Sequence, residues 1–187
     1  DFALKNINDT GWSVLAVSDG AGSASLSRQG SKLSCDLVLS YFEATFTAEY
    51  LKEFDENLLN HYSKTDEDSS KKISNFVSDN LSKAAWFVHK ELEKFSVQLE
   101  RPLKDLHATL IFALVKKYDF GYAILTFGVG DCPIGLLNKD LTEIKLMNWL
   151  DVGEFGGGTR FITMPEIFKS DKFYTRFGFT LVEDFSY

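Results

Sequence analysis

The fold of this chain is decided by residues 12–24, which read WSVLAVSDGAGSA. An apolar run rich in β-branched residues stops abruptly at Asp19 and gives way to small residues, which predicts a buried strand that ends in a tight loop. Such a strand end holds the Asp19 side chain rigidly, while Gly20 and Gly22 allow the backbone to come close to a bound ion or phosphate. Carboxylate and backbone carbonyl oxygens are the ligands that hard cations prefer. The stretch therefore predicts a cation site at Asp19 and Gly20.

A second stretch repeats this pattern later in the chain. Residues 121–129 predict another apolar strand, and it leads into Gly130 and Asp131. Two acids at the ends of neighbouring strands can share one ion. A helix N-cap or turn acid is the alternative interpretation of Asp19, and a hairpin-turn aspartate is the alternative for Asp131.

Composition limits the classes of function. With 187 residues, of which 44% are hydrophobic, the chain is long enough for one substantial core, so we expect a single domain over residues 1–187. A net charge of -7 argues against a nucleic-acid partner. The two cysteines, Cys35 and Cys132, lie far apart in sequence and form neither a disulfide framework nor a C-x-x-C pair, so they suggest neither disulfides nor a zinc site. No apolar stretch approaches the ~20 residues that span a bilayer, and no leader is apparent, so we expect no membrane partner and a cytoplasmic location.

Helical periodicity is clear in two places. Apolar residues at helical spacing predict an amphipathic helix over 25–47, and the strongest stripe predicts a helix over 70–97. A second helical piece is expected at 48–62, followed by a polar loop. His89 falls on or beside the polar side of its helix, so we expect it to face solvent.

The remaining segments favour strands. Residues 1–5 and the strand that precedes Asp19 predict a hairpin. Four further candidates follow one another and predict an antiparallel meander, over 107–115, 121–129, 133–137 and 141–147. The last part of the chain predicts a strand at 160–163, a short helical turn at 165–168 and a strand at 177–182.

In this order, several of these features resemble the metal-dependent protein serine/threonine phosphatases of type 2C, in particular their bacterial branch. The resemblance is carried by the long helix pair and by four stretches of sequence, residues 17–22, 107–110, 128–131 and 153–163. It implies an α+β fold, namely a four-layer α-β-β-α sandwich of two antiparallel sheets flanked by helix pairs, with a two-metal centre between the sheet edges.

The resemblance also implies roles for individual residues. Asp19 resembles the aspartate that bridges two Mn²⁺ or Mg²⁺ ions, Gly20 the residue whose carbonyl completes one shell, and Asp131 the acid that reaches a third, weaker ion. Residues 153–163 resemble the flap beside the cleft, where substrate choice is expected. Thr109 matches a small polar position in the core strand, which indicates packing. No substrate-binding residue is assigned.

The activity implied is hydrolysis of phosphoserine or phosphothreonine in proteins by a metal-activated water, with no catalytic nucleophile from the chain. Cys132 lacks the Cys-x5-Arg loop of thiol phosphatases, and neither His61, His89 nor His107 stands in a motif position. The family takes further metal ligands from a late Asp-Gly and an Asp-Asn pair that are not present by Tyr187, so we expect an incomplete domain. The main alternative is a catalytically inactive phosphatase-like binding or regulatory module, and a small-molecule phosphohydrolase is a further one. We expect a monomer whose partner is a phosphorylated protein.

Overall fold

The structure is a computed structural model that describes residues 1–54, 59, 67–151, 158–183 and 185. Its first two strands, β1 (Phe2–Ile7) and β2 (Trp12–Val17), form the predicted antiparallel hairpin, with Phe2 opposite Val17 and Ile7 opposite Trp12. Gly11 takes a positive φ of 75° in the turn between them, a conformation that glycine adopts without strain.

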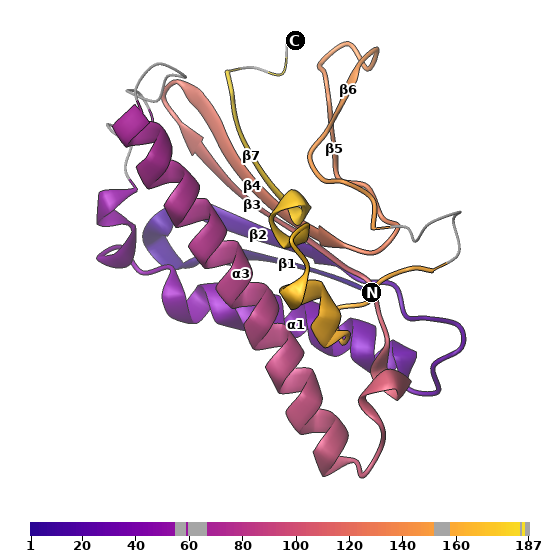
Figure 1. Cartoon of the computed structure of the whole chain (residues 1–187). Coiled ribbons are helices and arrows are strands. Elements are labelled where there is room, and N and C mark those ends of the chain that lie inside the picture. Colours follow the sequence, from indigo (N-terminus) through magenta and orange to yellow (C-terminus); the bar gives the residue numbers. More distant parts are fainter. Residues whose placement is uncertain (55–58, 60–66, 152–157, 184, 186–187) are drawn as a thin grey trace.

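The main sheet has five antiparallel strands in the order β1-β2-β3-β4-β7. Its central strands are β3 (Leu110–Tyr118) and β4 (Gly121–Val129), and β7 (Phe177–Val182) pairs with the outer edge of β4 (Figure 1). The bounds of β4 and β7 are those predicted, while β3 begins and ends three residues later than predicted. The fold is therefore α+β, as expected.

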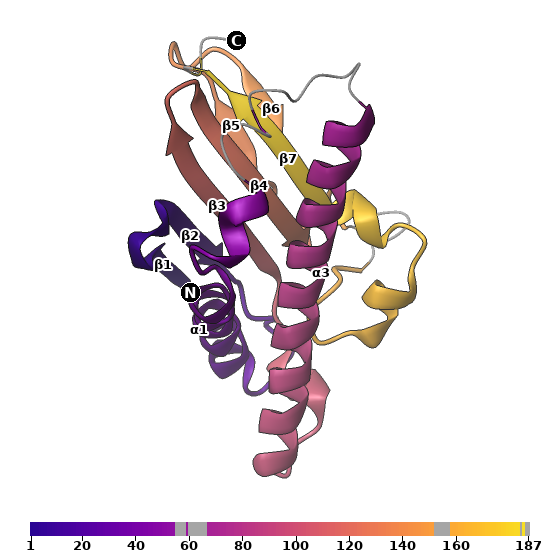
Figure 2. The same cartoon turned by 90° about the vertical axis from the view of Figure 1, so that its left-hand side faces the viewer.

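Two long helices cover one face of this sheet, and Figure 2 shows both on the same side. They are α1 (Ser27–Thr45) and α3 (Glu67–Gln98), which confirms the helices predicted at 25–47 and 70–97 within three residues at each end. Within the helical piece predicted at 48–62, the structure describes a short 3-10 helix at Tyr50–Glu53 and a helical conformation at Leu59, while residues 55–58 and 60–62 lie outside the described residues. No helix in the described part of the chain has the length and apolar character to cross a membrane.

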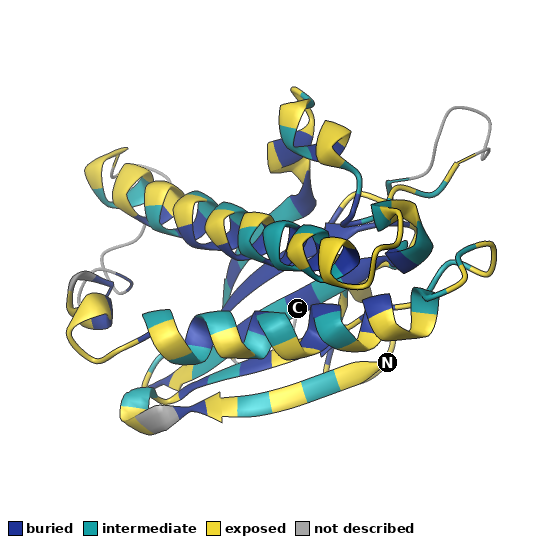
Figure 3. Cartoon of the chain, turned by 90° about the horizontal axis from the view of Figure 1, so that it is seen from below, coloured by how far each residue is buried: buried dark blue, intermediate teal, exposed yellow. Residues whose placement is uncertain are grey.

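The core lies between these helices and the sheet. Buried residues alternate with more exposed ones along β2 and most of β3, whereas β4 is buried over almost its whole length. Along the two long helices, buried residues recur on one side, as Figure 3 shows from below. Phe42 of α1 is fully buried, and its ring lies 4.9 Å from Phe46 and 5.7 Å from Phe112 of β3 between centroids. Val14 and Ala16 face the same interior from β2. This aromatic packing joins α1 to the middle of the sheet.

On the opposite face of the sheet, β1 and β2 expose four apolar side chains. Phe2 lies opposite Val17 and Leu4 lies opposite Leu15, and all four are more than 40% exposed. Two neighbouring strands rarely leave such a cluster in water unless something else covers it.

The predicted four-strand meander is wrong in its second half. Residues 135–137 and 144–146 form β5 (Gly135–Leu137) and β6 (Ile144–Leu146), a separate two-stranded sheet shorter than the segments predicted at 133–137 and 141–147. The backbone leaves the main sheet at Gly130, where φ is 117°. The free edge of β4 is then taken by β7.

The strand predicted at 160–163 is also wrong, because this segment forms an irregular turn. A backbone hydrogen bond from the Ile162 N–H to the Ala108 carbonyl, of 3.1 Å, ties it to the residues just before β3. The helical turn predicted next is present as a 3-10 helix, Pro165–Lys169, and a second one follows at Phe173–Arg176.

Gly30 of α1 provides a test of the packing between this helix and the segment before β3. A Cβ atom at Gly30 would overlap the carbonyl oxygen of Leu106. We therefore expect Gly30→Ala to lower the free energy of unfolding by about 1–3 kcal/mol in urea denaturation, even though alanine favours helix. The exposed neighbour Gln29 is the matched control, and Gln29→Ala should change stability little. Equal stability of both variants would contradict this packing.

Candidate functional site

The predicted site residues lie at one edge of the main sheet. Strands β2 and β4 run in the same direction, with β3 antiparallel between them. Their ends therefore meet at the edge where β3 begins. Asp19 and Asp131 each lie two residues beyond the end of their strand, and the strands themselves, β2 and β4, are roughly 10 Å apart because β3 separates them. The topology thus brings both acids to the same edge.

Thr109, the residue before β3, joins the two strand ends. Its hydroxyl accepts a hydrogen bond of 3.0 Å from the Asp19 N–H, and its own N–H donates to the Asp19 carbonyl at 2.8 Å. Its methyl group packs against Gly130, just after β4, so closely that a Cβ at Gly130 would lie 2.6 Å from Thr109 Cγ2. Thr109 is almost fully buried. Sequence reasoning assigned it to packing and missed its hydrogen bonds to Asp19.

We expect Thr109→Val to reduce the free energy of unfolding by about 1–3 kcal/mol, because it leaves the Asp19 N–H without its hydroxyl acceptor. Valine preserves the shape of the side chain, so the packing against Gly130 stays. Thr109→Ser is the complementary variant, because it keeps the hydroxyl and removes only the methyl group. Chemical denaturation should rank Ser above Val in stability, and the reverse order would contradict a positioning role for the hydroxyl.

Gly20 lies opposite Ala108 at a position where glycine is required. The hydrogen bonds of this short ladder are made by the flanking residues, including the Ala21 N–H to the His107 carbonyl at 2.9 Å, so the Gly20 carbonyl stays outside the ladder. A Cβ at Gly20 would lie 2.7 Å from the backbone of Ser27, the first residue of α1. The missing side chain thus lets the loop pass close to the helix.

Asp1 is a third acid at this edge, and sequence reasoning assigned it no role. It extends the β1–β2 ladder, because the Ser18 N–H donates to the Asp1 carbonyl at 3.0 Å and the amino group of Asp1 donates to the Ser18 carbonyl at 2.7 Å. The Ser31 hydroxyl of α1 donates to the Asp1 carboxylate at 2.5 Å. The strand register, which no local pattern reveals, is what places Asp1 beside Asp19.

Asp131 contacts the segment predicted as a flap. The Thr159 hydroxyl donates to the Asp131 carboxylate at 3.4 Å. Residues 153–157 of that predicted flap lie outside the described residues, whereas 158–163 are described. The Cys132 thiol lies 3.7 Å from the Thr109 hydroxyl, at the same edge.

The atoms at this edge that could bind a cation are carboxylate and backbone carbonyl oxygens. Asp19 and Asp131 are exposed, and within the described ranges neither forms an ion pair. Carboxylates together with a backbone carbonyl suit Mg²⁺ or Mn²⁺ better than zinc. Among the described residues, no three His, Cys, Asp or Glu side chains are grouped closely enough to hold an ion.

Two histidines hold the segment 161–163 next to the site. The expectation that His89 faces solvent is wrong: it is buried, and its Nδ1 lies 2.9 Å from the Ile162 carbonyl oxygen. His107 Nδ1 lies 2.6 Å from the Thr163 hydroxyl, and its ring stacks on Phe161 at 4.9 Å between centroids. Burial lowers the pKa of His107, which favours its neutral form.

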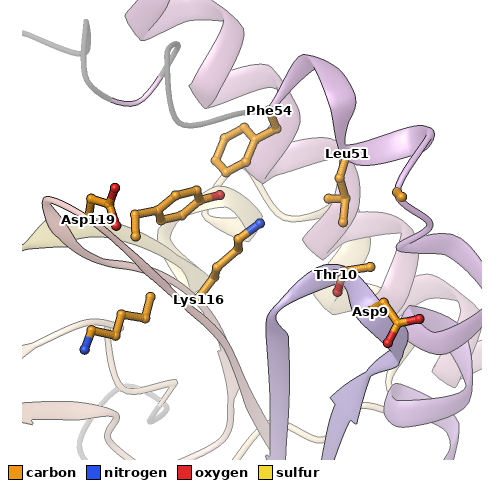
Figure 4. Close-up of a pocket in the computed structure, with 9 residues that line it drawn as sticks. Asp9, Thr10, Leu51, Phe54, Lys116 and Asp119 are labelled. Atoms are coloured by element: carbon orange, nitrogen blue, oxygen red, sulfur yellow. The ribbon is translucent and has the colours of Figure 1, made fainter.

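A pocket of about 520 Å³ lies at the opposite end of the sheet, near the turn that follows β1 and the end of β3 (Figure 4). Lys116 reaches into it between Asp119 and Thr10, with Leu51 and Phe54 on the helical side. Because the strand ends that carry Asp19 and Asp131 lie at the other end of β2 and β4, this pocket is separate from the candidate site.

Comparisons with known proteins agree with the resemblance. A family model described as "Protein phosphatase 2C" matches residues 1–177. The chain is similar in fold to a stage II sporulation E family protein from Thermanaerovibrio acidaminovorans, with a TM-score of 0.56 and 12% identity over 96% of this chain and 72% of that one. A bacterial serine phosphatase matches with a TM-score of 0.48 and 16% identity, over 99% of this chain and 63% of that one. No curated protein sequence matches the chain.

Proposed function

Because the chain belongs to the protein phosphatase 2C family, we propose that it is the part of a metal-dependent phosphatase that presents Asp19 and Asp131 to a phosphoserine or phosphothreonine in a protein substrate. The observation that carries this proposal is the convergence of the β2 and β4 ends at one sheet edge, where Thr109 contacts the residues on both sides. A phosphorylated protein is the partner that this activity requires.

We propose that Asp19, the Gly20 carbonyl and Asp131 provide ligands for two Mn²⁺ or Mg²⁺ ions, with a third ion near Asp131. Two exposed carboxylates and a carbonyl outside the ladder are consistent with this role, since hard cations take oxygen ligands. When bound, such ions lower the pKa of a water molecule and neutralise charge on the phosphoryl oxygens.

The chain's own residues position these ligands. Thr109 forms hydrogen bonds with both the N–H and the carbonyl of Asp19. Together with the β2 strand, these bonds limit the directions that the Asp19 carboxylate can take. The Ser31 hydroxyl of α1 holds the carboxylate of Asp1, the acid next to these ligands at the same edge. The precision of the site thus comes from the sheet edge and the start of α1.

We further propose that the sheet belongs to a four-layer sandwich. The exposed cluster of Phe2, Leu4, Leu15 and Val17 faces away from α1 and α3, on the side where the β5–β6 hairpin stands (Figure 1). A second antiparallel sheet that includes this hairpin would cover the cluster, because sheets pack face to face at ~10 Å through such apolar surfaces.

A phosphatase assay on the whole natural protein tests the proposal. We expect release of phosphate from a phosphoserine peptide with added Mn²⁺ or Mg²⁺, and none after chelation with EDTA. Activity that survives chelation would contradict the metal mechanism. Binding of the phosphopeptide without any hydrolysis would favour the alternative, a catalytically inactive binding module.

A further inference from the structure

A second pocket, of about 700 Å³, opens next to the candidate site and is not explained by metal binding. It lies between the segment that follows β6 and the two 3-10 helices before β7. We call it the flanking pocket, and the lining residues used below are Trp149, Leu150, Asp151, Arg160, Glu166, Lys172 and Arg176.

The flanking pocket is connected to the edge that carries Asp131. The Asp151 N–H, in the lining of the pocket, donates to the Gly130 carbonyl at 2.8 Å. On the other side, Arg160 directly follows Thr159, whose hydroxyl contacts the Asp131 carboxylate. A chain bound with its phosphorylated residue at the sheet edge would therefore place its neighbouring residues in this pocket.

Part of the pocket is rigid and electrically neutral. The Arg176 side chain is only 7% exposed, and its Nε and Nη2 donate to the same Asp151 carboxylate oxygen at 2.9 and 2.7 Å. Its Nη1 donates to the Lys172 carbonyl at 3.0 Å. These hydrogen bonds hold the Arg176 side chain in place, and Asp151 balances its charge. Arg176 therefore forms part of the pocket wall but offers little charge to a ligand.

The charges that a ligand could contact lie on the exposed residues at the rim of the flanking pocket, namely Arg160, Glu166 and Lys172. Arg160 and Lys172 are exposed, and neither forms an ion pair with a residue in the described ranges. Glu166 is the opposing exposed charge, so the rim carries a net positive charge in a chain whose total is -7. Arginine binds carboxylates well because two of its N–H groups fit the two carboxylate oxygens.

The rim also exposes apolar surface. Trp149 is 77% exposed and Leu150 is 44% exposed, and both line the same pocket as the two cationic side chains. A tryptophan with this exposure is a common contact point in binding sites. The combination suits a peptide segment with one acidic and one large apolar side chain.

We propose that the flanking pocket binds the residues next to the phosphorylated residue of a protein substrate and selects an acidic side chain through Arg160 and Lys172. This inference rests on the proposed phosphatase function. It adds a substrate class, phosphoproteins with an acidic residue beside the phosphorylated one, and assigns it to a pocket whose lining contains none of the proposed metal ligands.

The test compares two phosphoserine peptides in the whole natural protein with Mn²⁺. One carries Glu and Leu beside the phosphoserine, and the other replaces Glu with Gln. We expect kcat/KM to be about fivefold higher for the acidic peptide, and the preference to disappear in the double variant Arg160→Ala with Lys172→Ala. Glu166→Gln should increase the preference. The matched control is Lys169, an exposed lysine three residues before Lys172 that does not line the pocket. Lys169→Ala should keep the preference for the acidic peptide.

Equal kcat/KM for the two peptides in the wild type, or a preference that persists in the double variant, would overturn the inference. The small substrate p-nitrophenyl phosphate separates this failure from that of the proposed function, because it has no flanking residues. If the wild type hydrolyses none of the three substrates, the proposed function fails. Fluorescence anisotropy with the two labelled phosphopeptides then still decides whether the pocket distinguishes Glu from Gln.

Discussion

Asp19→Asn is expected to reduce the Mn²⁺-dependent hydrolysis of a phosphoserine peptide by at least about a hundredfold in kcat. Asparagine has nearly the same size as aspartate but removes the negative charge that a bridging ligand requires. The backbone of residue 19 should stay in place, because its contacts with Thr109 are made by main-chain atoms of Asp19. The loss should therefore appear in activity and not in circular dichroism.

Asp140→Asn is the control for this variant. Asp140 is an exposed acid in the turn between β5 and β6, away from the sheet edge that carries Asp19, so its loss should leave kcat unchanged. Asp131→Asn should have a smaller effect than Asp19→Asn, since Asp131 is expected to reach a weaker ion. Retention of more than half of the wild-type kcat in Asp19→Asn would contradict the role proposed for this carboxylate.

Phe42→Ala is expected to lower the free energy of unfolding by about 3–5 kcal/mol, the largest stability effect that we predict. The Phe42 ring is fully buried and contacts Phe46 and Phe112, so its removal leaves a cavity between α1 and the centre of the sheet. Urea denaturation monitored by circular dichroism measures this loss directly.

Val97→Ala is the matched control, because Val97 lies on α3 and is 71% exposed. Its truncation should change the free energy of unfolding by no more than about 0.5 kcal/mol. A loss below about 1 kcal/mol in Phe42→Ala would show that α1 does not pack on β3 as described.

The sequence predicts the elements whose signal is local. The apolar stripe of α3 repeats over many turns, and the Gly121–Val129 strand is bounded by a glycine at its start and by Gly130 just after its end, so both were predicted well. The helix predicted at 48–62 is tested only in part, because residues 55–58 and 60–62 lie outside the described residues; Tyr50–Glu53 form a 3-10 helix and Leu59 is helical.

Strand pairing is where local patterns fail. β4 pairs with β7 from the far end of the described chain, while the strands that follow β4 in sequence form their own hairpin. Apolar alternation indicates a strand but does not specify its neighbour. The β5–β6 hairpin is separated from the main sheet because the chain turns away after β4 through a positive φ at Gly130. A glycine in the sequence does not reveal which φ it adopts.

For the candidate site, motif positions predicted which acids to examine, and the topology explains how two of them reach one edge. The Thr109 hydroxyl and the Asp1 carboxylate were not assigned, because their positions depend on the register of β2 against β1 and β3. His89 was predicted to face solvent because helical periodicity cannot show that the segment at Ile162 packs over that side of α3.

The most direct test of the account is a Mn²⁺ titration of the whole natural protein by isothermal titration calorimetry, repeated with Asp19→Asn. We predict binding of two ions in the wild type, with a third and weaker ion at higher concentration, and the loss of the two tighter ions in the variant. No Mn²⁺ binding by the wild type, or identical binding by Asp19→Asn, would contradict the claim that this sheet edge is a metal centre.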